Sequence, residues 1–140
     1  MAMVHEFALF SKETTISFDK IAHESCCTIH DYLICYIFDT LNWIKTLSYD
    51  NIEQQGLCYT GITIFEGISL YQLINILKAW HNLFTLAQDT IVLKGEYSIA
   101  EEKFTRIEVQ KIEVLSQIAD IIALTEKAAY TDERIIHFGL

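Results

Sequence analysis

The residues best suited to chemistry lie together in one short stretch, HESCCTIHD, at positions 23–31. It holds two histidines, two adjacent cysteines and two carboxylates. On a helix, His23, Cys26 or Cys27, and His30 would share one face, because steps of three, four and seven residues return to the same side. Imidazole and thiolate are the ligands that zinc prefers, and a thiol beside a histidine is a nucleophile pattern. The stretch therefore raises a zinc site and a catalytic thiol as hypotheses.

The spacing of these residues disfavours a zinc site, and the charges around them disfavour a catalytic thiol. On a helix His23 and His30 would lie about 10 Å apart along the axis, too far to meet at one zinc ion. The remote ligand candidates, Cys58 and His81, belong to no spaced pair, and the sequence has no Cys-x2-Cys or His-Glu-x2-His motif. The neighbouring acids would raise a thiol pKa, which opposes catalysis. We interpret the stretch as a partly buried helix without catalytic residue, metal or cofactor, and keep zinc and a vicinal disulfide as alternatives.

Composition predicts one mainly α domain, 1–140. The chain is 51% hydrophobic, with no proline and five glycines, so helix breakers are scarce. Apolar residues recur at three- and four-residue steps over 18–47, 69–88 and 98–129. Ser69 is the expected N-cap of the second helix, and Ser98 with Glu101 has the form of a capping box that opens the third. We expect a compact bundle of three to five helices, with a polar loop at 48–56.

Short β-prone runs predict a minor β element beside this bundle. They lie at 61–65, 90–97 and 134–139, and the C-terminal run is expected either to pair with 62–65 or simply to pack. The N-terminal run HEFALF fits either a helical turn or an edge strand.

Charge excludes some classes of partner. The formal charge is −9 and the pI about 4.9, which disfavours direct contact with nucleic acid. The longest apolar run, 32–38, is much shorter than the roughly 20 residues of a membrane span. The N-terminus does not read as a secretory signal, so we expect a cytoplasmic protein with reduced cysteines. The first 70 residues hold three lysines against nine acids, a field that attracts basic proteins.

Tyrosines flank the polar loop, and aromatic side chains ringed by acids are typical anchors of a protein interface. The residues predicted to bind a partner are Asp39, Tyr49, Asp50, Glu53, Tyr59 and Glu66.

Three stretches carry a resemblance to a known class of proteins. They are YTGITIFEGISLYQLINILKAWHNLF at 59–84, EKAAY at 126–130 and RIIHFGL at 134–140. Together they resemble the small immunity-type proteins of bacterial polymorphic and contact-dependent toxin systems, over residues 57–140. The resemblance implies a cytoplasmic, non-enzymatic inhibitor of one cognate toxin domain, often a basic nuclease, and implies no particular site residues. A self-associating helical protein, for example a homodimer, and a metal- or thiol-dependent enzyme remain as alternatives.

Overall fold

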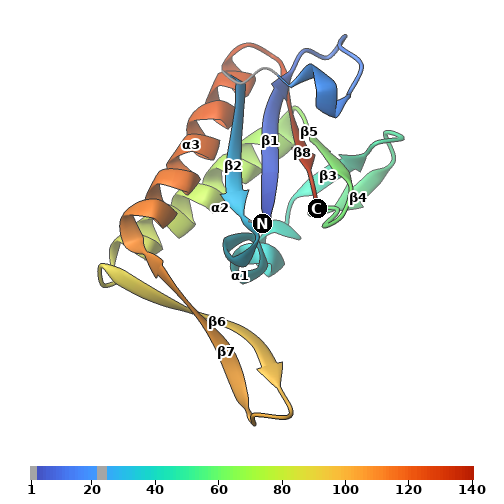
Figure 1. Cartoon of the computed structure of the whole chain (residues 1–140). Helices are drawn as coiled ribbons and strands as arrows, with labels where there is room; N and C mark the ends of the chain where they lie inside the picture. Colours follow the sequence, from blue (N-terminus) through green and yellow to red (C-terminus); the bar gives the residue numbers. More distant parts are fainter. Residues whose placement is uncertain (1–2, 22–24) are drawn as a thin grey trace.

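The computed structural model describes residues 3–21 and 25–140, and it shows a mixed α/β fold rather than a helical bundle (Figure 1). The strands are β1 (Val4–Phe10), β2 (Cys26–His30), β3 (Lys45–Ser48), β4 (Glu53–Gln55), β5 (Ile62–Phe65), β6 (Thr90–Ser98), β7 (Lys103–Gln110) and β8 (Arg134–Phe138). The helices are α1 (Asp31–Leu41), α2 (Ile68–Thr85) and α3 (Lys111–Tyr130), with a 3-10 turn at Phe18–Lys20. Within the described ranges, no helix has the length and apolar character of a membrane span.

Six strands form one antiparallel sheet in the order β2-β1-β8-β5-β3-β4. The C-terminal strand β8 lies inside this sheet, between β1 and β5. Thr63 of β5 is in register with His137 of β8, so of the two alternatives for the tail, pairing with 62–65 is the one the structure shows. Four of the five residues of β8 are buried, which explains why its apolar run does not alternate with polar residues.

Alternation along the strands divides the core between the two faces of the sheet. Phe7 and Ile135 point to the face that α2 and α3 cross, and they join the main core with residues of all three helices (Figure 1). Ala8 and Ile136 point to the opposite face. There the segment after β1 covers the sheet, with Ile16 packed against it.

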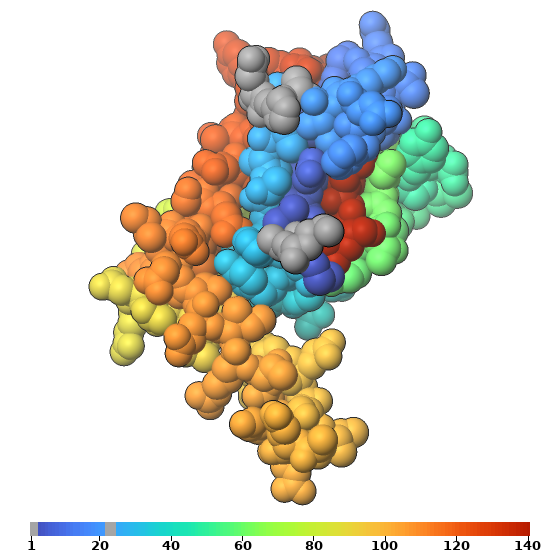
Figure 2. Space-filling model, in the orientation of Figure 1, coloured from blue at the N-terminus to red at the C-terminus, as the bar shows by residue number. Residues whose placement is uncertain are grey.

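The hairpin of β6 and β7 is a separate two-stranded sheet that projects from the body of the molecule (Figures 1 and 2). Leu93 and Val109 anchor its base in the main core. Every residue from Glu101 to Glu108 is exposed. We call residues 90–110 the arm.

The predicted long helix over 18–47 is wrong. Its span contains β2, α1 and β3, and only 31–41 is α-helical. The buried residues of α1 do follow the helical rhythm, and they include Leu33, Ile37 and Leu41. Ile29 in β2 and Ile44 before β3 continue that spacing by coincidence. Both are buried, but neither is part of the helix.

The predicted start of the third helix at Ser98 is also wrong. The Glu101 N–H does donate to Ser98 Oγ, at 3.3 Å, but this bond closes the hairpin turn of the arm. A capping box and a turn use the same local hydrogen bond, so the motif could not distinguish them. The helix begins at Lys111. The predicted strands at 61–65, 90–97 and 134–139 are confirmed as β5, β6 and β8.

The helix predicted over 69–88 is α2, which begins and ends slightly earlier. Its N-cap is Gly67, and not Ser69 as predicted. Ser69 Oγ instead donates to the carbonyl of Lys45 at 2.5 Å, which ties the start of α2 to β3.

Substitution of Ile135 by Ala tests the central position of β8. The side chain is fully buried in the main core, so we expect the free energy of unfolding to fall by about 2–5 kcal/mol in urea denaturation. Ile112→Ala is the matched control, because Ile112 is 77% exposed, and its effect should stay within about 0.5 kcal/mol. Equal losses from the two substitutions would contradict the placement of β8.

Candidate functional site

The cysteine pair of the HESCCTIHD stretch lies on strand β2 and not on a helix. Successive side chains of a strand point to opposite faces, so Cys26 packs in one core and Cys27 in the other. Burial, followed by the charge of nearby Glu6, raises the pKa of Cys26 to about 11. Burial chiefly raises the pKa of Cys27 to about 12. Both groups are therefore neutral thiols that diverge and do not form one site.

The histidines of the stretch do not join the cysteines either. His30 is the N-cap of α1, where its ring stacks on Tyr32 and its backbone N–H donates to Gln117 Oε1 at 2.8 Å. His23 lies outside the described residues. Among residues 3–21 and 25–140, no group of three or more His, Cys, Asp or Glu side chains is placed to hold a metal ion.

A different polar cluster connects the two ends of the chain inside the core. His5 of β1 and His137 of β8 are both fully buried, and His5 Nδ1 lies 2.9 Å from His137 Nε2. His5 Nε2 lies 2.9 Å from Asp31 Oδ1 at the start of α1. At the other end, His137 Nδ1 lies 3.4 Å from the hydroxyl of Thr63 in β5.

The four groups fit one chain of donors and acceptors in which each imidazole accepts through one nitrogen and donates through the other. The Thr63 hydroxyl donates to His137, His137 Nε2–H donates to His5, and His5 Nε2–H donates to the carboxylate. Burial, assisted by the nearness of His5, lowers the pKa of His137 to about 3, so His137 carries no charge at neutral pH. Burial alone would raise the pKa of Asp31, but the hydrogen bonds from Tyr59 and His5 outweigh it and lower that pKa.

Two potential nucleophiles lie at the outer end of this chain. The Tyr59 hydroxyl donates to Asp31 Oδ1 at 2.6 Å, and Cys35 Sγ lies 3.7 Å from the same oxygen. The hydrogen bond to Asp31 and then burial raise the pKa of Tyr59. Burial, aided by the charge of Asp31, raises the pKa of Cys35. The raised pKa values keep both groups protonated at neutral pH, and the lowered pKa of Asp31 makes the adjacent carboxylate a weak base for either of them. The cluster therefore ties β1, β5, β8 and α1 together.

Four of the predicted partner-binding residues are exposed on one continuous segment. Asp39 lies near the end of α1, Tyr49 and Asp50 form the β3–β4 turn, and Glu53 lies in β4, at the free edge of the sheet. Of the other two, Tyr59 turns to Asp31 in the buried cluster. Glu66 is half-buried between β5 and α2.

The sequence interpretation missed two exposed apolar side chains in the same segment. Trp43 follows α1 and is 71% exposed, and Ile52 in the β3–β4 turn is 64% exposed. Trp43 fell within the helix predicted over 18–47. The residues at 43–46, Trp-Ile-Lys-Thr, do not alternate between apolar and polar, so no local signal in the sequence marked Trp43 as exposed. We call the set Asp39, Trp43, Tyr49, Asp50, Ile52 and Glu53 the acidic aromatic face.

Comparison of the chain with models of known families, with curated proteins and with solved structures found no match.

Buried His137 should make the stability of the fold depend on pH. Its ordinary pKa is 6.5 and its folded value is about 3, so between these values the unfolded chain binds a proton that the folded chain does not. The free energy of unfolding should therefore fall as the pH falls below 6.5, by about 1.4 kcal/mol per pH unit from this group. Urea denaturation between pH 6.5 and 4.5 measures the slope.

The matched variants are His137→Gln and Ile135→Val. The Gln variant should lose this part of the slope, because its amide keeps a donor and an acceptor but does not titrate. The Val variant should lower stability equally at every pH and keep the slope. An unchanged slope in the Gln variant would contradict the burial of a neutral His137.

Proposed function

We propose that this chain is a non-enzymatic immunity-type protein that binds and neutralises a cognate basic toxin domain through the acidic aromatic face. The observation that carries the proposal is that Trp43, Tyr49 and Ile52 are exposed on the same segment as three exposed carboxylates, at the sheet edge. The resemblance of residues 57–140 to immunity-type proteins supports the same class.

The apolar side chains of this face contribute little to the fold. Trp43 is 71% exposed, Tyr49 is 54% exposed and Ile52 is 64% exposed, so most of their surface remains in water. Trp and Tyr are enriched among the few residues that carry most of the binding energy at interfaces, because they bury a large area with few rotatable bonds. These three side chains are therefore suited to anchor a partner.

The charges of the face set the kind of partner. Residues 39–55 contain three acidic residues, Asp39, Asp50 and Glu53, and one basic residue, Lys45. Beyond this local excess, the chain carries −9 in all, so its long-range field attracts a basic domain and speeds encounter. If that domain acts on nucleic acid, carboxylates placed over its cationic groups would block the positions of phosphates.

The backbone of the face offers a further contact. β4 ends the sheet, so its outer backbone groups are not paired with another strand of the sheet. An extended segment of a partner can pair with such an edge, and then the flanking side chains fix which segment is accepted.

Calorimetry with the protein encoded by the adjacent gene tests the proposal. We expect a one-to-one complex with a dissociation constant on the order of nanomolar near 50 mM salt, weakening at least about tenfold near 500 mM as exposed charges are screened. Absence of binding to that protein, or binding that strengthens with salt, would contradict it.

Substitutions on the acidic aromatic face separate the contribution of its apolar side chains to binding from the contribution of its charges. Trp43→Ala should weaken binding by about 2 kcal/mol or more, because it removes the largest anchor. Asp50→Asn with Glu53→Gln should instead reduce the salt dependence. The controls are Tyr130→Ala, an aromatic residue that is 92% exposed at the end of α3, and Glu113→Gln, an exposed acid of α3. A Trp43→Ala variant that binds like the wild type would place the interface elsewhere.

A further inference from the structure

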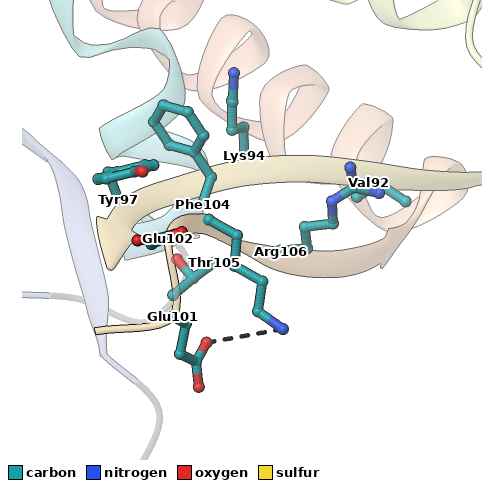
Figure 3. Close-up of a pocket in the computed structure, with 9 residues that line it drawn as sticks. Val92, Lys94, Tyr97, Glu101, Glu102, Phe104, Thr105 and Arg106 are labelled. Atoms are coloured by element: carbon teal, nitrogen blue, oxygen red, sulfur yellow. Dashed lines mark ion pairs between the residues drawn. The ribbon is translucent and has the colours of Figure 1, made fainter. Parts of the chain in front are cut away.

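The outer face of the arm gathers cations and aromatic rings around a hollow of about 1040 Å³ (Figure 3). Lys94 of β6 lies directly opposite Arg106 of β7, and Tyr97 lies opposite Phe104. The rings of Tyr97 and Phe104 meet edge to face at 4.9 Å, and Lys94 Nζ lies 3.8 Å from the centre of the Phe104 ring. Glu101 and Glu102 of the turn line the same hollow.

The fold does not account for this face by itself. A two-stranded sheet is marginally stable alone, and only the base of the arm is packed in the core. Tyr97 is 52% exposed and Phe104 is 41% exposed. Lys94 and Arg106 are like charges directly across the ladder, which is unfavourable, and within the described part of the chain neither forms an ion pair. A partner that brings carboxylates and apolar surface would satisfy all of these groups.

The order of charges along the arm is self-complementary. On β7 and its turn, Arg106 lies two residues from Phe104 on one side, and Glu102 lies two residues from it on the other. Arg106 lies at strand spacing from Phe104, about 6.6 Å along β7, whereas Glu102 lies in the turn just before the strand, with a φ of 53°. A two-fold axis close to Phe104 would bring Arg106 of each copy to the turn of the other, which carries Glu102, with the aromatic rings between them.

We propose that this protein forms a homodimer in which the outer faces of two arms pack on each other in antiparallel orientation. Arg106 of each copy then meets Glu102 in the turn of the other, while Glu101 stays with Lys103 of its own copy, whose Nζ lies 3.8 Å from Glu101 Oε2. The arm holds three cations and four acids, so it is nearly neutral, while the rest of the chain carries −8. The arm is therefore the part of the chain through which two copies approach with the least repulsion.

Sedimentation equilibrium in about 150 mM salt, where repulsion between the acidic bodies is screened, tests the dimer over a wide concentration range. We expect a reversible monomer–dimer equilibrium for the wild type. Arg106→Glu and Glu102→Arg should each weaken it at least about tenfold, because a two-fold axis makes every substitution act twice. The double variant should recover the wild-type constant within about threefold, since it exchanges the charges of the pair.

The control is Lys127→Glu, which makes the same charge change on the exposed side of α3 and should leave the equilibrium unchanged. A monomeric wild type would overturn the proposal. So would single variants that dimerise normally, or a double variant that fails to recover, because each result would place the contact elsewhere. Restoration by the double variant would also show that neither single substitution acts by unfolding the arm.

Discussion

The fold depends on one strand at the end of the chain. β8 pairs with β1 on one side and with β5 on the other, so it alone joins the β2-β1 pair to the β5-β3-β4 part of the sheet. Its residues also enter both cores, Ile135 on the helix side and Ile136 on the other. Contacts between strands so far apart in sequence cost much loop-closure entropy, which slows folding. The continuity of the six-stranded sheet therefore depends on its last strand.

The buried histidine cluster fixes where this strand meets the rest of the body. Through His137, His5 and Asp31, the middle of β8 is linked to β1 and to the first turn of α1. The far end of α1 leads directly to Trp43 and the β3–β4 hairpin. The position of the acidic aromatic face is thus set by α1 and by the packed sheet. The arm depends on the body mainly through its base, so the two surfaces are displayed independently.

Local sequence signals predicted those strands and helices whose own residues strongly favour them. They failed where pairing between distant strands determines the secondary structure. Ile62–Phe65, Thr90–Ser98 and Arg134–Phe138 carry enough β-branched residues to be recognised alone. The helical spacing around α1 and the Ser98–Glu101 hydrogen bond are both present in the structure. The spacing, however, runs on beyond the helix, and the hydrogen bond closes a hairpin turn instead of capping a helix. His5 gave no signal, because its partner lies 132 positions away. Trp43 was missed since its exposure follows from where α1 ends.

We propose that the body is a scaffold that presents a partner-binding face at one sheet edge and a self-association arm elsewhere. Amide hydrogen exchange of the chain alone and with the protein encoded by the adjacent gene tests this most directly, because it locates the bound surface peptide by peptide. We expect slower exchange over residues 42–56 in the complex, with residues 90–110 unchanged. Slower exchange confined to the arm or to α3, with 42–56 unchanged, would contradict it.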